Sequence, residues 1–115
     1  MARKDVVIRQ GATWKMVFRV RDDGTDRDLT GYAVRMQVRA THATAATLLS
    51  VDTSSLGGIT VENAIGRVSI EVPASSTVSL PSPSLAVYDV EIESGSGVVE
   101  RVIEGVARIT PEVTR

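Results

Sequence analysis

The chain has 115 residues, a length that suits one domain with a buried core, spanning residues 1–115. Its net charge of −1 argues against a dedicated nucleic-acid binder, and the absence of cysteine excludes disulfides, thiol nucleophiles and the common structural zinc sites. The absence of cysteine also fits a protein made in a reducing cytoplasm. No apolar run is long enough to span a membrane, and MARKDVVIRQ lacks the apolar core of a secretory signal.

The first predicted element is an amphipathic strand in TWKMVFRVR, residues 13–21. Apolar and polar side chains alternate along it, and a period of two residues is typical of a strand that buries one face. The inward face would carry Trp14, Met16, Phe18 and Val20, and the outward face Lys15, Arg19 and Arg21.

A second strand of the same kind follows in YAVRMQVR, residues 32–39. Its inward face would carry Tyr32, Val34, Met36 and Val38, and its outward face Arg35, Gln37 and Arg39. The intervening DDGTDRDLTG is rich in turn-forming residues, so we predict that the two strands are neighbours joined by a polar loop. Their outward cations would then form one basic stripe, made of Lys15, Arg19, Arg21, Arg35 and Arg39.

The middle of the chain predicts shorter elements. THATAATLLSVD reads as a loop before a strand at residues 48–51, and ITVEN as a further strand that the AIG turn leads into RVSIEV. Proline cannot donate to a sheet ladder, so Pro73 should end that strand. PASSTVSLPSPS could hold one helical turn capped by Ser75 or Ser76.

Two strands joined by a hairpin turn are predicted at the end of the chain. AVYDVEIE alternates again, and SGSG forms the turn. The last strand, VVERVIEGVARIT, does not alternate cleanly; Gly105 indicates a bulge or a close backbone approach, and the faces of Val102 and Ile103 stay open. In the first of the two strands, Ala86, Tyr88, Val90 and Ile92 would point inward and Asp89, Glu91 and Glu93 outward.

Seven or eight short strands with frequent turns predict an all-β protein folded as an antiparallel β-sandwich. A small sandwich has open sheet edges, which invite pairing with another chain, so we favour an assembly component. The larger core residues would be Trp14, Phe18, Tyr32, Met36 and Tyr88.

No catalytic, cofactor-binding or metal-binding residue stands out. Asp22, Asp23, Asp26 and Asp28 offer oxygen ligands, yet their spacing does not fit a calcium loop and Asp-Gly is what a tight turn needs. His42 is the single histidine, so one chain offers no histidine-based metal cluster or catalytic pair. None of the serines at Ser75, Ser76, Ser79, Ser82 and Ser84 lies in a nucleophile elbow. We therefore predict a non-enzymatic protein without a small-molecule substrate.

The two halves of the chain differ in charge. Residues 1–57 carry nine basic and six acidic side chains, and residues 58–115 carry four basic and eight acidic ones. Either the surface is polarised and suited to self-association, or the halves neutralise each other across neighbouring strands. The candidate interface residues are Lys15, Arg19, Arg21, Arg35, Arg39, Asp89, Glu91 and Glu93.

Two binding functions of another class remain open alternatives. The basic stripe could bind single-stranded nucleic acid, and a β-sandwich could bind carbohydrate. Both functions use exposed aromatic side chains, whereas the four aromatic residues of this chain fall on apolar faces.

A set of short motifs in a fixed order resembles the N-terminal domain of the baseplate upper protein family of tailed phages and the small stand-alone phage proteins like it. The order is a G-x-T before an apolar strand, an Asp-Gly loop, DLTGY, G-x-V-x-I with a Ser/Thr-rich segment, YDVE and a closing PEVTR. The PSPS segment departs from the family pattern, in which a shorter run precedes the YDVE strand. The matching positions are Gly11 to Thr13, Asp23–Gly24, Asp28 to Tyr32, Gly66 to Ile70, Tyr88 to Glu91, Gly105, and Pro111 to Arg115.

The resemblance implies an immunoglobulin-like sandwich with a structural role in a virion. The chain would be a tail, neck, baseplate or fibre-attachment module, bound to other virion proteins and to copies of itself. A capsid decoration or cement protein is the alternative within this class, and the localisation implied is the virion.

Overall fold

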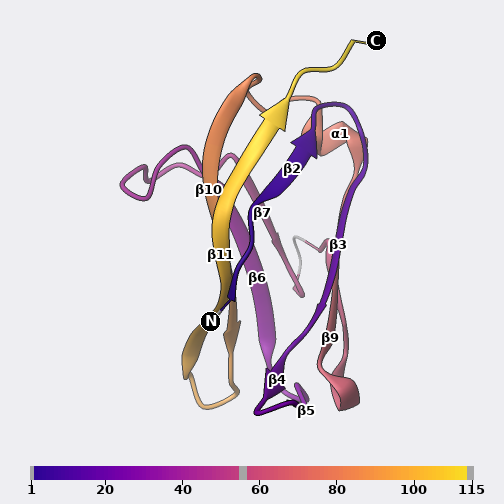
Figure 1. Cartoon of the computed structure of the whole chain (residues 1–115). Helices are drawn as coiled ribbons and strands as arrows, with labels where there is room; N and C mark the ends of the chain where they lie inside the picture. Colours follow the sequence, from indigo (N-terminus) through magenta and orange to yellow (C-terminus); the bar gives the residue numbers. More distant parts are fainter. Residues whose placement is uncertain (1, 55–56, 114–115) are drawn as a thin grey trace.

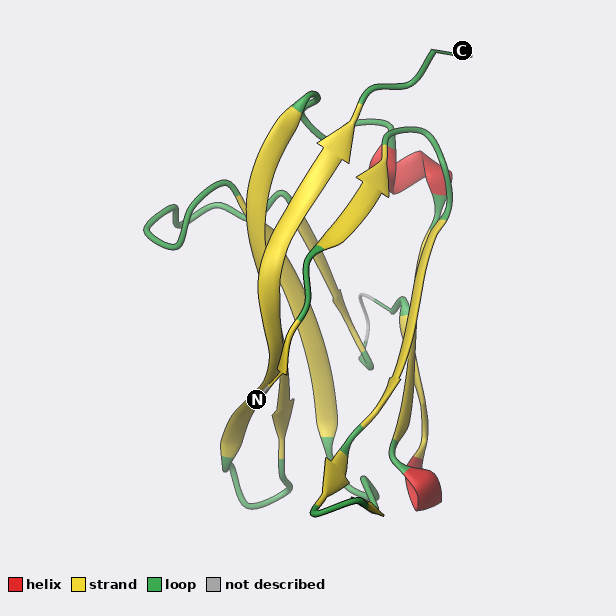
Figure 2. Ribbon diagram, in the orientation of Figure 1, coloured by secondary structure: helices red, strands yellow, loops and turns green. Residues whose placement is uncertain are grey.

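The chain folds into two β-sheets packed face to face, in a computed structural model that describes residues 2–54 and 57–113 (Figure 1). The larger sheet has the strand order β1-β11-β10-β6-β7, with β2 also on β11; the smaller has the order β3-β9-β8. A two-stranded hairpin, β4–β5, lies at one end (Figure 2). The strands of the larger sheet are β1 (Ala2–Arg3), β2 (Val6–Arg9), β6 (Ala33–Arg39), β7 (Leu49–Asp52), β10 (Ser84–Glu93) and β11 (Val99–Thr110). The remaining elements are β3 (Trp14–Arg19), β4 (Arg21–Asp22), β5 (Thr25–Asp26), β8 (Ile59–Glu62), η1 (Asn63–Ile65), β9 (Arg67–Val72) and α1 (Ala74–Thr77).

The core fills the space between the two sheets and follows the alternation of the strands. In β6 and β10 every second side chain is buried, as the sequence predicts. Trp14, Met36 and Tyr88 lie in the core, whereas Phe18 and Tyr32 are half-buried and pack against it. The larger fully buried side chains are Ile8, Leu29, Met36, Ile70, Ile92 and Ile109.

The strands over residues 14–19 and 33–39 are not neighbours, so the prediction that they pair is wrong. β3 pairs with β9 in the smaller sheet, and β6 pairs with β10 and β7 in the larger one. The residues between them form the β4–β5 hairpin, whose turn is Asp23–Gly24, and then cross to the other sheet. Two amphipathic strands can bury their apolar faces against each other across a sandwich as well as side by side in one sheet.

The N-terminal strands run parallel to the last strand, while the other pairings of the two main sheets are antiparallel.

Between β1 and β2 the chain kinks at Lys4 and Asp5. The Val106 N–H donates to Asp5 Oδ1 at 3.0 Å, and the Tyr88 hydroxyl donates to the Lys4 carbonyl. A hydrogen bond from a buried phenol therefore holds the kink to the core.

Gly105 lies where β11 passes this kink. A methyl group on Gly105 would collide with the carbonyl of Lys4, so the glycine permits the close backbone approach that the sequence indicates. The bulge in β11 lies a little earlier: Val90 pairs with Ile103 and Glu91 with Arg101, which leaves Val102 as the extra residue. Ile103 is buried and Val102 is half-buried against the core.

The far end of the sandwich is closed by α1 and the segments around it. Pro73 ends β9 as predicted, but Pro73 also occupies the N-cap position of α1, so the expectation of a Ser75 or Ser76 cap is wrong. Proline has no side-chain acceptor, so α1 begins without a side-chain cap. Buried Thr77 donates to the Ala12 carbonyl at 2.8 Å, and the Gln10 side chain donates to the Leu80 carbonyl at 2.9 Å.

Within residues 2–54 and 57–113, neither α1 nor η1 is a helix that could cross a membrane. Thr114 and Arg115, the end of the closing motif, lie outside the described residues.

Candidate functional site

The outer face of the larger sheet carries a continuous layer of charged and polar side chains. β6, β10 and β11 are adjacent there, and the side chains that do not enter the core point outward side by side. We call this surface the charged face. It consists of Arg35, Gln37, Arg39, Asp89, Glu91, Glu93, Arg101 and Glu104.

Arg35 anchors one end of the charged face. It lies opposite Glu91 in the ladder, and its guanidinium contacts Glu91 at 3.1 Å and Glu93 at 2.9 Å. The hydrogen bond with Glu93 raises the pKa of Arg35 against the opposing effect of burial. The sequence brings these three together because β6 and β10 run antiparallel in a register that sets the two acidic side chains beside one cation.

Arg101 makes the corresponding cluster on the other side of β10. Its guanidinium lies 3.3 Å from Asp89 and 3.4 Å from Glu104. Burial raises the pKa of Asp89, and the neighbouring charge of Glu91 raises it further, while Arg101 opposes both. Asp89 therefore loses its proton less readily than an ordinary aspartate, because its pKa is raised.

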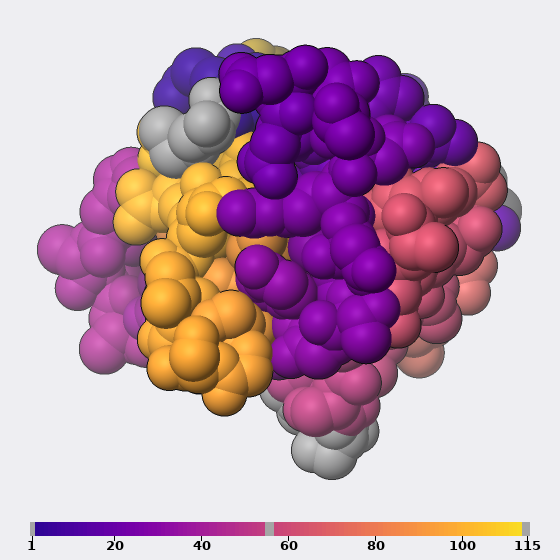
Figure 3. Space-filling view, turned by 90° about the horizontal axis from the view of Figure 1, so that it is seen from below, coloured from indigo at the N-terminus to yellow at the C-terminus, as the bar shows by residue number. Residues whose placement is uncertain are grey.

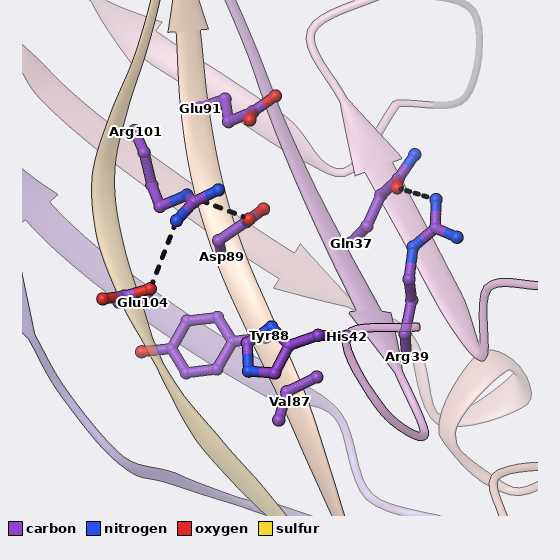
Figure 4. Close-up of a pocket in the computed structure, with 9 residues that line it drawn as sticks. All are labelled: Gln37, Arg39, His42, Val87, Tyr88, Asp89, Glu91, Arg101 and Glu104. Carbon is purple, nitrogen blue, oxygen red and sulfur yellow. Dashed lines mark hydrogen bonds and ion pairs between the residues drawn. The ribbon is translucent and has the colours of Figure 1, made fainter. Parts of the chain in front are cut away.

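A shallow hollow of about 390 Å³ lies between these clusters and the loop that follows β6 (Figure 4). Figure 4 shows Arg39 beside Gln37, whose side-chain oxygen accepts at 2.8 Å. Arg39 also donates to the carbonyl of Thr44 at 2.8 Å, which ties the loop to the sheet and places His42 at the rim. No serine lines this hollow among the residues that the structure describes, and its acids contact arginines.

The predicted basic stripe does not exist as one surface. Lys15 and Arg19 project from the outer face of the smaller sheet, on the opposite side of the sandwich from Arg35 and Arg39, and Arg21 lies in β4. Lys15 contacts Glu71 at 3.3 Å, and Arg19 and Arg21 contact Asp26 at 3.7 and 3.0 Å. The eight predicted interface residues thus divide between the two outer faces and the β4–β5 hairpin.

Some ion pairs join the two halves of the chain, and others, such as Arg19 with Asp26 and Arg101 with Asp89, lie within one half. Arg35 pairs with Glu91 and Glu93, and Arg27 contacts Glu100 at 2.8 Å. Seen from below, the tip of the β10–β11 hairpin lies beside the segment that carries Arg27 (Figure 3). In the pairs made by Arg35 and Arg27, a basic side chain of the first half meets an acidic side chain of the second.

The aspartate-rich loop is organised by hydrogen bonds and ion pairs. Asp26 contacts Arg19 and Arg21, and Asp22 contacts Arg27 at 3.2 Å. The side chain and backbone N–H of Thr30 hydrogen-bond to Asp28, which lowers the pKa of Asp28. Among the residues that the structure places, His, Asp and Glu form no group of three suited to a metal ion.

Arg101 and Glu104 belong to the charged face, yet the alternation of the sequence does not identify them. They are three residues apart, and a regular strand would put them on opposite faces. The bulge at Val102 restores them to one face. The signal in the sequence was the broken alternation of the last strand together with the opposite charges at this spacing.

The chain matches no family model and no curated protein sequence. Among solved structures it is similar to the extracellular domain of the voltage-gated sodium channel β4 subunit, from structures described as parallel homodimers that explain its role in cell–cell adhesion. The TM-score is 0.52 over 98% of this chain and 95% of that one, at 8% sequence identity. A likeness at this identity concerns the fold alone, and it shows that the chain is an immunoglobulin-like β-sandwich.

Proposed function

We propose that the chain is a non-enzymatic assembly module of a tailed-phage virion, which joins copies of itself or neighbouring virion proteins in the tail, neck or baseplate. The observation that carries the proposal of an assembly role is the charged face. Its side chains are held in place by ion pairs within the chain, so they are already ordered before a partner arrives.

The setting in a virion is supported by the ordered motifs that resemble the baseplate upper protein family. The immunoglobulin-like fold is the one this resemblance implies. The similar sodium-channel domain is a homodimer, which is in keeping with self-association of this kind of sandwich.

The described residues do not form the surfaces that binding of single-stranded nucleic acid or of carbohydrate would require. A nucleic-acid site needs the basic stripe on one face, and its cations divide between two sheets. A carbohydrate platform needs exposed aromatic rings, whereas Trp14 and Tyr88 are buried and Phe18 and Tyr32 are half-buried.

Quantitative mass spectrometry of particles purified from a lysate that contains this gene tests the proposal. We expect the chain in the particle at a few to a few dozen copies, in the range of the symmetric tail structures. Hundreds of copies would move it to the capsid surface as a decoration protein. Absence from the particle would overturn the structural role.

A further inference from the structure

The outermost strand of the smaller sheet, β3, has one side without a neighbour. In the sheet order β3-β9-β8 it is an edge strand, and the N-terminal strands β1 and β2 that run near it pair instead with β11 of the other sheet. Figure 1 shows β3 and the β2 segment along the same side of the sandwich, in separate layers. β3 therefore presents a six-residue edge.

The register identifies the backbone groups on this free edge. The Val20 N–H donates to the Gly66 carbonyl at 2.9 Å, one residue beyond the last β3–β9 pair. The backbone N–H and C=O groups of the even-numbered residues of β3 are therefore directed toward β9. In an antiparallel ladder the backbone groups of the residues in between are directed to the opposite side of the strand, away from that partner. The N–H and C=O groups of Lys15, Val17 and Arg19 therefore face outward. No hydrogen bond among the residues that the structure describes reaches them from outside the β3–β9 ladder.

A groove follows this edge between the two sheets. One part, of about 380 Å³, lies between residues 4–7 and residues 14–17. The other, of about 540 Å³, lies between residues 18–21 and residues 100–103. Lys4 lines both parts, so the groove extends along β3. Half-buried Phe18 and Val102 give its second part an apolar floor.

The side chains along the edge specify the chemistry of an occupant. Val17 is 60% exposed, the outward valine of β3, and Lys15 and Arg19 flank it on the same face. Arg19 and Arg21 share the single carboxylate of Asp26. Lys4 makes no ion pair with any residue that the structure describes. The groove carries a positive excess, because its lining has five cations against the two acids Asp5 and Glu100; the cations are Lys4, Lys15, Arg19, Arg21 and Arg101.

We infer that the free edge of β3 receives an extended segment of another protein, which adds to the smaller sheet as a further strand. Such strand addition takes its affinity from main-chain hydrogen bonds and its specificity from alternate side chains. The segment would carry an apolar side chain opposite Val17, acidic side chains opposite Lys15 and Arg19, and apolar side chains facing the groove. This inference rests on the proposed function and names the partner chemistry of an assembly module.

A second copy of the chain is a poorer occupant. Symmetric antiparallel pairing of two β3 strands centred on Val17 would set Lys15 directly opposite Arg19 twice. Like charges opposite each other destabilise a strand pair. An acidic segment of another protein avoids this repulsion and neutralises the excess.

The test begins with amide exchange of the free chain by NMR. We expect the amides of Lys15, Val17 and Arg19 to exchange rapidly, and those of Met16 and Phe18 to be protected by their bonds to β9. If all five are equally protected in the free chain, the edge is already covered by a second copy and the inference fails.

The second step uses a synthetic peptide whose successive outward positions are glutamate, valine and glutamate and whose inward positions are valine. We expect it to protect the three edge amides, and a peptide with lysine in place of both glutamates to bind at least about tenfold more weakly. Failure of the glutamate peptide to bind would mean that Lys15 and Arg19 only guard the edge against pairing.

Val17→Pro separates main-chain pairing from side-chain contact. Proline removes an N–H that faces solvent, which an edge strand tolerates, so we expect a folded chain that no longer binds the peptide. Val17→Ala keeps the N–H and should retain binding. Equal binding by the proline variant would overturn the inference.

The two proposals fail separately. If the chain is found in particles but its β3 edge binds no acidic peptide, the virion role stands and this binding site is ruled out. If the β3 edge binds the peptide but the chain is absent from particles, the binding site stands and the virion role is ruled out.

Discussion

Tyr88 links the core of the sandwich to the kink between β1 and β2, and its ionisation should be visible in the stability of the fold. Burial raises the pKa of Tyr88 to about 12 from its ordinary 10.0. The folded chain therefore holds the phenol proton more tightly than the unfolded chain does. The stability that this contributes is complete below about pH 10 and is lost as the pH rises toward 12.

We expect the free energy of unfolding to fall by roughly 1–2 kcal/mol more in the native chain than in Tyr88→Phe between pH 10 and 12. At neutral pH, Tyr88→Phe should cost roughly 1 kcal/mol because the hydrogen bond to the Lys4 carbonyl is lost. Urea denaturation of both proteins across this range measures the difference. Parallel pH curves would show that Tyr88 ionises as freely when folded as when unfolded.

Gly105 supports a second prediction, because its place in β11 leaves no room for a side chain. Gly105→Ala should destabilise the fold by roughly 1–3 kcal/mol, since the methyl group would push the Lys4 carbonyl away from β11. Gly95→Ala is the matched control, because a methyl there would meet only the Gly31 carbonyl at 3.7 Å. Thermal unfolding compares the two variants, and equal melting temperatures would contradict the close approach.

At the scale of the elements, the sequence identifies the strands and the hairpin of β10 and β11, which is confirmed, but it does not identify the partner of β3. The alternation along β6 and β10 fixes their inward faces, because burial on one side of a strand imposes a period of two. The same pattern in β3 and β6 does not say whether the strands lie in one sheet or face each other across the core. A polar Asp-Gly loop fits both arrangements, and here it forms its own hairpin.

The alternation of side chains along the strands predicts only part of the charged face. Arg35 and Arg39 lie on one strand and the acids of residues 89–93 on another, and simple alternation finds both sets. Alternation does not find Arg101 and Glu104, because the extra residue Val102 between them changes which face of β11 the following side chains occupy. A bulge depends on backbone packing against other elements, which local sequence does not encode.

The orientation of β3 can be checked by a pair of substitutions. Trp14 is 9% exposed and packs in the core, so Trp14→Ala should cost roughly 3–5 kcal/mol. Val17 points outward from the same strand, and Val17→Ala should change stability by less than about 0.5 kcal/mol. Chemical denaturation of both variants measures the contrast. A neutral Trp14→Ala would mean that the faces of β3 are reversed.

At the scale of the whole molecule, many of the charged side chains are paired with opposite charges across the fold. Lys15 and Arg35 of the first half of the chain contact acids of the second on the two outer faces of the sandwich, and Arg27 contacts Glu100. Exposed pairs of this kind add little to stability, with a median near 0–1 kcal/mol. Their larger effect is to order the side chains that a partner would meet, which favours association over a contribution to folding.

Reversing the charges of the charged face tests this last point. Arg35→Glu with Arg39→Glu would place two more carboxylates among Glu91, Glu93 and Asp89, so we expect a folded chain whose self-association is weakened by about tenfold or more. Lys15→Glu with Arg67→Glu is the matched control, since it makes the same change of charge on the outer face of the smaller sheet and also breaks ion pairs. Sedimentation velocity across a range of protein concentrations, together with circular dichroism to monitor folding, compares the two variants with the native chain. If the control weakens association as much as the first variant does, the effect comes from net charge, and the charged face is not the surface at which copies meet.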